Sequence, residues 1–481
     1  MRSLEVTNLS CSYGTTSVLK NVSFSLEPGE VLAVIGPSGS GKTTLTYCVS
    51  GIIPNIIPAA VSGSIKIDGE EMLGKGVEEV TRHVGFVLQN YELQIFGLTV
   101  EDDIELSSEG CGDERVRHIM AAFRLDAYAK YFVHELSGGL KRRLVIASAL
   151  LKDVDYLVVD DPVANLDWSG KKTLAETIRM LRSKGKGVLL LGKRMKGLEE
   201  VIDRVVELPG RKDTSNTHSV ITGFPPERTK VTSNGPAASF ESVWFRYSKD
   251  FVLRDVNLEV RRGEVVSVMG PNGSGKTTMM KLMNGLLKPT KGKVTVSGID
   301  TRSSNPSELA RHVGTVFQES EKYIVFESVW DEVAFGPKNL GIGDGYVEKA
   351  LEMLGLDGKR CGNTFSLSVG EKMRLSIASA IAMDPEIILM DEPTTGQDEE
   401  TLSQLASIIR GLKSYGKTVM IVTHDTDFAF QTSDRVVILK DGGIVYEGEP
   451  SPLLNDLEML IEWGLEPPSR LGDTVCLQSS A

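Results

Sequence analysis

Long apolar runs, paired cysteines and an excess of basic residues are all missing from this sequence. No apolar stretch approaches the roughly 20 residues that a membrane-spanning helix needs, and the opening MRSLEVTNLS lacks a signal-peptide core. None of the five cysteines forms a CxxC pair, which argues against disulfides, a zinc site or an iron–sulfur cluster. The net charge of −12 argues against a surface that coats nucleic acid.

What remains is the composition of an ordinary globular protein. The 481 residues are enough for two or three domains with large cores, and 25% charged residues is a usual fraction. Scattered cysteines suggest reduced thiols in a cytoplasmic protein. If the protein takes part in a membrane process, we expect its membrane-spanning part to be a separate chain.

Two glycine-rich loops give the clearest chemical signal. GPNGSGKTT, residues 270–278, stands between an apolar β-branched run, 265–269, and a helical pattern, 279–287. GPSGSGKTT, residues 36–44, follows a similar run at 31–35. A strand, a glycine loop and a helix in this order predict a phosphate-binding P-loop, because glycines let backbone N–H groups turn toward an anion. A second copy makes a chance match untenable.

Each residue of the two loops is predicted to contact nucleotide. Lys42 and Lys276 can reach the β- and γ-phosphates, and the hydroxyls of Thr43 and Thr277 can ligate Mg²⁺. The full predicted set is Gly36, Pro37, Ser38, Gly39, Ser40, Gly41, Lys42, Thr43, Thr44, Gly270, Pro271, Asn272, Gly273, Ser274, Gly275, Lys276, Thr277 and Thr278.

The loops belong to an internal tandem repeat. Six landmarks of the first half recur in the second at a near-constant offset of about 230 residues. This predicts one domain at 1–208, a polar Pro-, Gly-, Ser- and Thr-rich linker at 209–236, a second domain at 237–449 and a tail at 450–481. The tail carries an amphipathic stretch, 453–463.

The pattern of apolar residues predicts an α/β fold in each half. Alternation in LEVTNLSCSYG and SFESVWFRYS indicates antiparallel strands near the start of each domain. Buried-strand runs at 156–159, 188–191, 387–390 and 419–422 lie among helical patterns, which indicates a parallel core sheet. We therefore expect two P-loop domains, each with a small antiparallel subdomain.

Acidic residues end two of the buried strands. In YLVVDDP and IILMDEP the first acid, Asp160 or Asp391, suits Mg²⁺ coordination, usually through water. The next residue, Glu392, is placed to orient or deprotonate an attacking water, whereas Asp161 is one methylene shorter. A helix cap is the structural alternative, and a four-residue apolar strand before each acid disfavours it.

A histidine and two glutamines complete the predicted catalytic chemistry. His424 closes IVTHD and can bridge the γ-phosphate and the water, while its counterpart Lys193 cannot act as a neutral acceptor at ordinary pH. Gln89 and Gln318 follow short β-like runs and can contact Mg²⁺ or the water. The catalytic set is therefore Glu392, His424 and Gln318, and the metal set is Thr43, Gln89, Asp160, Thr277, Gln318 and Asp391.

Two further features pair across the repeat. Tyr13 and Tyr247 precede the P-loops and can stack on adenine. LSGGLKRR and LSVGEKMR each open a helix and offer an anion site at its N-terminus. Any one of these residues alone fits a structural role, and their recurrence in both halves favours function. The residues concerned are Ser137, Gly138, Gly139, Ser368 and Gly370, with Val369 in place of a glycine.

These landmarks resemble the ATP-binding cassette (ABC) superfamily over nearly the whole chain. The resemblance implies Walker A motifs at 36–44 and 270–278, signatures at 136–140 and 367–371, Walker B motifs at 156–160 and 387–391, and D-loops ending at Asp167 and Asp398. It also implies ATP and Mg²⁺ as cofactors, with each ATP held between one half's P-loop and the other half's signature.

That pairing gives two unequal composite sites. Site one combines Lys42, Asp160, Asp161 and Lys193 with the Val369 signature, so all three departures from the family pattern fall on it. Val369 is expected to lack glycine's conformations and to add bulk beside the γ-phosphate. Site two combines Lys276, Asp391, Glu392 and His424 with the first-half signature, where Leu140 replaces the family's glutamine. We expect site two to hydrolyse ATP and site one mainly to bind it.

The segments after the glutamines point to one branch of the superfamily. NYELQIFGLTVEDDI and ESEKYIVFESVWDEVAFGPKNLG look like the ATPase components of energy-coupling factor (ECF) importers, as do the tail GLEPP and GIIPNIIPAAVSG at 51–63. Tyr91, where that group has proline, is a departure. The resemblance implies uptake of a vitamin, a vitamin precursor or a transition-metal ion, with residues 90–100 and 319–329 facing an integral coupling subunit.

The ECF reading also implies a small substrate-binding membrane subunit, no nucleic-acid partner and a peripheral place on the cytoplasmic face of the cell membrane. The alternatives are a tandem sugar-importer ATPase, which VWDEVAFGP disfavours, and a soluble tandem ABC protein acting on ribosomes, which Asp161 and the short linker disfavour. A chromosome-type ATPase needs an inserted coiled coil that the sequence does not have. A non-enzymatic regulator would need both sites inactive.

Overall fold

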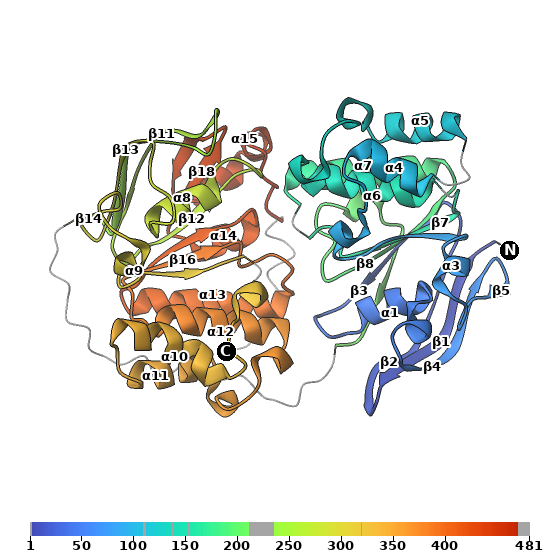
Figure 1. Cartoon of the computed structure of the whole chain (residues 1–481), viewed down its shortest axis with the longest axis horizontal. Coiled ribbons are helices and arrows are strands. Elements are labelled where there is room, and N and C mark those ends of the chain that lie inside the picture. Colours follow the sequence, from blue (N-terminus) through green and yellow to red (C-terminus); the bar gives the residue numbers. More distant parts are fainter. Residues whose placement is uncertain are drawn as a thin grey trace. The chain divides into compact units, whose positions relative to one another are not determined.

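The computed structural model describes residues 2–108, 112–136, 138–151, 153–164, 166–210, 235–318 and 320–469. Within it the chain divides into two compact units, residues 1–212 and 213–481 (Figure 1). Most of the predicted linker, the predicted site residue Ser137 and the end of the tail lie outside the described residues.

The first half contains a core sheet in the order β6-β7-β8-β3-β9 and an antiparallel sheet in the order β2-β1-β4-β5. The core pairings are parallel. The core strands are β3 (Val31–Ile35), β6 (Val84–Val87), β7 (Tyr156–Asp160), β8 (Gly187–Gly192) and β9 (Arg204–Glu207). The antiparallel strands are β1 (Leu4–Tyr13), β2 (Thr16–Leu26), β4 (Ala60–Ile67) and β5 (Glu70–Glu71).

The second half repeats this arrangement with one additional strand. Its core sheet has the order β15-β16-β17-β12-β18-β19, and its antiparallel sheet the order β11-β10-β13-β14. The core strands are β12 (Val265–Met269), β15 (Val313–Val316), β16 (Ile387–Asp391), β17 (Thr418–Val422), β18 (Arg435–Lys440) and β19 (Gly443–Gly448). The antiparallel strands are β10 (Ala238–Arg246), β11 (Phe251–Val260), β13 (Lys291–Val296) and β14 (Ile299–Asp300). The predicted fold class, two α/β P-loop domains with antiparallel subdomains, is confirmed.

The helices follow the same repeat. Those of the first half are α1 (Lys42–Val49), α2 (Ile52–Asn55), α3 (Val77–Val80), α4 (Val100–Ser107), α5 (Asp113–Ala122), α6 (Gly138–Leu150) and α7 (Trp168–Ser183). Those of the second half are α8 (Lys276–Met283), α9 (Pro306–Leu309), α10 (Val329–Leu340), α11 (Gly345–Met353), α12 (Val369–Ile381), α13 (Glu399–Ser414), α14 (Thr426–Thr432) and α15 (Leu457–Glu462). None of the described helices is long and apolar enough to cross a bilayer.

Each core sheet is the middle layer of its half. In the second half Ile388 and Met390 of β16 pack with α10–α13, whereas Ile387 and Leu389 face α8 and the antiparallel sheet. Figure 1 shows this order, with β11 and β13 on one side of β16, and α12 and α13 on the other. Alternate strand residues therefore serve two separate hydrophobic cores, which is why these strands are apolar throughout.

One predicted element has different bounds in the structure. The helical pattern was expected over 279–287, but α8 begins at Lys276 and ends at Met283. The chain leaves the helix because Gly285 has a φ of +76°, a left-handed conformation that favours glycine. Beginning at Lys276 places the P-loop lysine and both threonines in the first turn of the helix.

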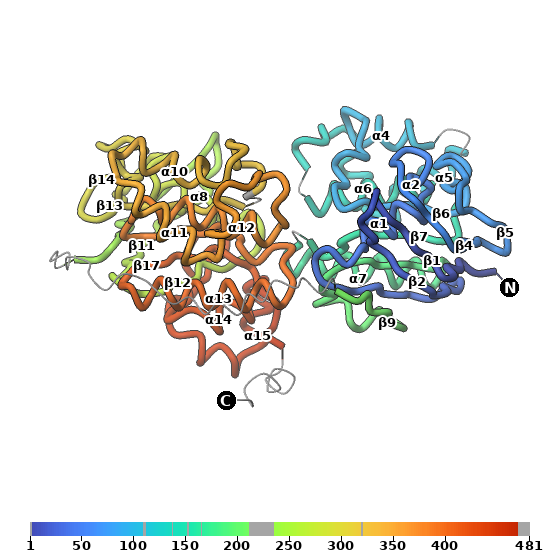
Figure 2. The backbone as a smooth tube through the Cα atoms, turned by 90° about the horizontal axis from the view of Figure 1, so that it is seen from below, coloured from blue at the N-terminus to red at the C-terminus, as the bar shows by residue number. Residues whose placement is uncertain are grey.

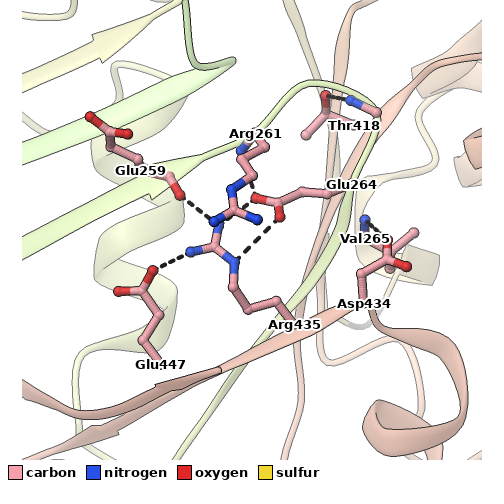
Figure 3. Close-up of polar contacts among 9 residues, drawn as sticks. Glu259, Arg261, Glu264, Val265, Thr418, Asp434, Arg435 and Glu447 are labelled. Atoms are coloured by element: carbon pink, nitrogen blue, oxygen red, sulfur yellow. Dashed lines mark hydrogen bonds and ion pairs between the residues drawn. The ribbon is translucent and has the colours of Figure 1, made fainter. Parts of the chain in front are cut away.

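A buried ion-pair cluster fixes the additional strand β19 (Figure 3). Arg435 of β18 contacts both carboxylate oxygens of Glu264 and the carboxylate of Glu447 on β19, and it donates to the Glu259 carbonyl at 2.6 Å. In the first half Arg204 similarly contacts Glu30, at 2.9 Å. The Arg204 side chain is 44% exposed, whereas that of Arg435 is 9% exposed.

This difference predicts unequal contributions to stability. Arg435→Leu should lower the free energy of unfolding of the second half by about 3–5 kcal/mol, because it leaves the buried Glu264 carboxylate unpaired. The matched change Arg204→Leu should cost less than about 1 kcal/mol, because water solvates that ion pair. Guanidinium unfolding of both variants measures the difference, and equal losses would contradict the burial argument.

Candidate functional site

Each of the two P-loops contains a glycine whose left-handed backbone conformation disfavours any other residue. Gly275, just before α8, has a φ of +105°, and a Cβ there would lie 2.5 Å from Leu253. Gly41 before α1 is equivalent, with a φ of +95° and Leu19 at 2.5 Å. Each loop therefore wraps the N-terminus of an eight-residue helix and directs backbone N–H groups inward.

The P-loop lysines are buried and aligned along their own loops. Lys276 Nζ donates to the carbonyls of Gly270 at 2.8 Å and Pro271 at 3.0 Å. Lys42 Nζ makes the same bonds to Gly36 and Pro37, at 2.6 and 2.8 Å. Both ammonium groups thus lie inside the loop that is predicted to surround the phosphates, as the motif requires.

The first Walker B acid of each half lies against the P-loop threonine. Thr277 Oγ1 donates to Asp391 Oδ1 at 3.1 Å. Burial raises the pKa of Asp391 to about 6, against the opposing effect of this hydrogen bond. In the first half burial and the charge of Asp161 raise the pKa of Asp160 to about 6, while a hydrogen bond from Thr43 lowers it.

These residues fit a magnesium ion. Asp160 Oδ2 is buried and has no hydrogen-bond partner among the described residues, so an ionised carboxylate there needs a cation. A hydroxyl and a carboxylate are hard oxygen ligands, which Mg²⁺ prefers. In the described part of the chain no three His, Cys, Asp or Glu side chains gather in one place, so water and phosphate oxygens would supply the other ligands.

The second half brings its predicted base and histidine into contact. Glu392, directly after β16, and His424, just after β17, lie with Oε2 and Nδ1 2.8 Å apart. The His424 backbone N–H also donates to Glu392 Oε2, at 3.3 Å. These bonds orient the carboxylate, while the backbone of Glu392 is held at a φ of +45°. Such an arrangement suits a base that must face one water molecule.

In the first half the corresponding acid, Asp161, is influenced by positively charged side chains instead of a histidine. Burial raises the pKa of Asp161, whereas the charges of Lys193 and Arg142 lower it. Gln89 Nε2 also donates to Asp161 Oδ2, at 3.5 Å. Asp161 therefore serves as a partner for cations and amides. In the second half the corresponding carboxylate, Glu392, is instead held by a histidine.

Arg142 was missed in the sequence. It lies in α6, is 3% exposed, and donates to the carbonyls of Asp161 and Pro162. Its guanidinium also stacks on the ring of Tyr91, with 5.0 Å to the centroid. In the second half the equivalent residue is Met373. This difference between the two repeats is the signal by which the sequence could have identified Arg142. Arg142 ties the Walker B end of the first half to its signature helix.

The two tyrosines that are predicted to stack on adenine lie at the P-loops. The Tyr13 hydroxyl is 3.4 Å from Thr44 Oγ1, and the Tyr247 hydroxyl is 3.2 Å from Thr278 Oγ1. Tyr13 is the last residue of β1, and Tyr247 directly follows β10, both in the antiparallel subdomains. The predicted D-loop ends Asp167 and Asp398 are N-caps, of α7 and α13. Gln318 follows β15, as Gln89 follows β6.

The signature residues begin α6 and α12. Gly138 and Gly139 are the first two residues of α6, while Ser368 caps α12 by accepting from the Glu371 N–H at 3.3 Å. Gly370 follows Val369 within α12. The expected loss of glycine's conformations at Val369 has no consequence here, because Val369 lies in a helix and does not have a positive φ. Only the bulk of its side chain distinguishes it from glycine.

Comparison with known proteins adds three findings. The family model described as ABC transporter matches residues 19–164 and 253–395. Relatives provisionally named ABC transporter ATP-binding proteins are 33% identical in Methanosarcina acetivorans, over 92% of this chain and 89% of that one, and 30% identical in Vibrio parahaemolyticus, over 97% and 92%. The cbiO1 structure from Clostridium perfringens, part of the ABC transporter complex cbiONQ, is 29% identical and covers 47% of this chain and 94% of its own, with a TM-score of 0.44.

The raised pKa of Asp391 predicts a pH-dependent stability without nucleotide or metal. A carboxyl group with a folded pKa of about 6 and an unfolded pKa of about 3.9 costs stability as the pH rises through that window. Asp391→Asn should therefore raise the free energy of unfolding at pH 7.5 by about 1–3 kcal/mol, and by nothing below about pH 4. Urea unfolding at several pH values measures this. Asp160→Asn should behave alike, and a pH-independent effect would contradict the cause given.

Proposed function

Because this chain belongs to the ABC transporter family, whose ATPases bind ATP with Mg²⁺ and couple its hydrolysis to transport, we propose that it energises an importer of the energy-coupling factor type. The supporting observation is an exposed apolar loop after each predicted Mg²⁺-contacting glutamine, anchored the same way in both halves. The loops carry the segments that look like ECF ATPases.

The first-half loop is held by one buried carboxylate. Asp103 of α4 is 2% exposed and accepts from the N–H groups of Phe96 and Gly97, at 2.8 and 3.0 Å. A Cβ on Gly97 would lie 2.2 Å from the backbone N of Asp103, so only glycine fits this close approach. The Phe96 side chain is directed outward and is 79% exposed. A rigid loop that displays an aromatic side chain to solvent suits protein docking.

The second-half loop uses the equivalent acid. Glu332 of α10 accepts from the N–H groups of Val325 and Phe326, both at 2.9 Å, and Val325 is 75% exposed. Phe326, nominated in the sequence as a docking residue, instead packs on Phe335 with 5.2 Å between ring centroids. Ile95 packs on the first-half core. Phe96 and Val325 are therefore the residues best placed to touch a partner.

The partner is an integral-membrane coupling subunit, which joins a small membrane subunit that binds the cargo. That cargo is a vitamin, a vitamin precursor or a transition-metal ion. The chain then acts at the cytoplasmic face of the membrane, as a peripheral protein without nucleic-acid partners. A tandem sugar-importer ATPase is the second candidate. Purifying the natural complex and identifying the membrane proteins that co-purify with the chain would distinguish the two candidates.

Within this function we assign unequal work to the two composite ATP sites. At site two Glu392 orients the attacking water and accepts its proton, His424 holds that carboxylate, and Lys276 with the P-loop N–H groups binds the phosphates. Mg²⁺, when bound, neutralises phosphate charge. Site one retains Lys42 for the phosphates and Thr43 and Asp160 for Mg²⁺, so ATP still binds. Its second acid, Asp161, is one methylene shorter than Glu392 and feels the charges of Lys193 and Arg142, so water activation is weak.

The docking surface predicts a specific defect. Phe96→Glu and Val325→Glu should each abolish assembly with the membrane subunits, because a charge would be buried at the interface. ATP binding should remain, since neither side chain lies in a P-loop. The matched control Ile56→Glu, at a residue that is 67% exposed just after α2, should assemble normally. Co-purification from membranes measures this, and normal assembly of both loop variants would refute the placement.

The unequal sites predict different effects of removing each acid. Glu392→Gln should lower kcat at least about 100-fold while ATP still binds, because the amide cannot accept a proton. Asp161→Asn should change the rate by less than about threefold. Single-turnover assays should show one ATP cleaved per chain in the fast phase. Two fast cleavages, or equal losses in the two variants, would show that both sites hydrolyse ATP.

A further inference from the structure

The chain after β19 folds back onto the machinery of the second half. The stretch begins with a 3₁₀ turn, η8 (Ser451–Asn455), and α15, and continues to Ser469. Leu460 and Leu465 are fully buried with Met269, the last residue of β12 before the P-loop, and with Ala429 of α14. Figure 2 shows α14 and α15 in the same red C-terminal part of the second half.

We propose that residues 464–469 are a positioning segment for hydrolysis, which sets the loop carrying His424 against Glu392 and the P-loop. This inference rests on the proposed catalytic role of Glu392 and His424. Glu466 of this segment lies 40 positions after Thr426, the residue that it contacts beside the histidine loop. Residues 464–469 contribute no reacting group, so their role is to hold the histidine.

The contacts on the histidine side are directional. Thr426, two residues after His424 and fully buried, donates its hydroxyl to the Glu466 carbonyl at 2.7 Å. Ser469 donates its backbone N–H and its hydroxyl to the two carboxylate oxygens of Asp427, both at 2.8 Å. Hydrogen bonds to a buried carbonyl and to a carboxylate fix the start of α14 at a defined position.

The opposite flank of the histidine is also held. Thr423 Oγ1 lies 2.8 Å from Thr394 Oγ1, two residues after Glu392, and accepts from the Asp425 N–H at 3.0 Å. His424 therefore lies between an inner anchor to the Walker B loop and an outer anchor to the tail. Loss of either anchor would let the Nδ1 to Oε2 distance of 2.8 Å vary.

The same segment also touches the P-loop. Gly464 packs on Pro271, where a Cβ would lie 3.3 Å from the proline Cβ. Lys440 of β18 donates to the Glu462 carbonyl at 2.9 Å, which fixes the end of α15. The tail thus joins the phosphate-binding loop and the histidine loop, and both contribute to the same ATP site.

The first half differs at these positions. Met195 and Lys196 stand where the second half has Thr426 and Asp427, so neither the hydroxyl donor nor the carboxylate acceptor is available there. The half with Lys193 in place of the histidine therefore lacks the side chains for such an anchor. The anchor and the catalytic histidine occur together, which is what a positioning role predicts.

Thr426→Val tests the proposal, because valine keeps the shape and removes only the hydroxyl. We expect kcat to fall about fivefold to 20-fold at an unchanged KM for ATP, since the histidine is misplaced while the P-loop still binds. Thr426→Ser should restore most of the rate. The control is Thr432→Val in the same helix, which removes a 2.7 Å bond to the Phe428 carbonyl that does not involve the tail.

Two truncations of the full chain complete the test. A chain ending at Ser469 keeps every contact above and should match the intact protein, whereas one ending at Trp463 should lose at least as much kcat as Thr426→Val does. Adding Thr426→Val to the shorter chain should cause no further loss, because the truncation has already removed the Glu466 carbonyl that Thr426 binds.

The proposal is overturned if Thr426→Val and Thr432→Val reduce kcat equally, or if Thr426→Ser does not restore the rate. It is also overturned if the losses of kcat caused by Thr426→Val and by the truncation after Trp463 are additive. If the shorter chain does not fold, the Val and Ser variants with the Thr432 control decide alone. A rate unaffected by Glu392→Gln would instead refute the proposed function itself, whatever the tail variants show.

Discussion

The convergence of parallel strand ends is the constraint on which this molecule depends. β16, β17 and β12 are neighbours in one sheet, and their carboxyl ends lead into the Asp391–Glu392 pair, His424 and the P-loop. The sheet is buried on both faces, so these groups meet where water is scarce. Burial raises the pKa of Asp391, and that cost is offset only when Thr277 and a cation face the carboxylate.

The two halves share the same framework of strands and glycine loops but differ in the side chains that this framework carries. The strands and glycine loops at the carboxyl end of each core sheet do not depend on which acid follows Asp160 or Asp391. The second half uses this freedom for a carboxylate held by His424, whereas the first half surrounds Asp161 with Lys193, Arg142 and Gln89. We propose that this difference leaves hydrolysis to the Glu392 site and mainly ATP binding to the Asp161 site.

Loops around this edge are held by single polar groups rather than by large cores. Asp103 and Glu332 each bind two backbone N–H groups and display an apolar side chain, and the Glu466 carbonyl holds Thr426. A few hydrogen bonds of about 1 kcal/mol each are therefore enough to define the conformation of each loop.

The sequence alone determined the repeat, the P-loop framework and the strand–acid motifs, because glycine loops and uniformly apolar strands are local patterns with few alternatives. It also indicated the differences at Asp161, Lys193 and Val369. Only the tertiary structure decided that α8 ends before Gly285, that Val369 is helical, and that Val325 rather than Phe326 is exposed. It alone joined Arg142 to Tyr91 and the tail to Thr426, because contacts between residues far apart in sequence leave no local pattern to read.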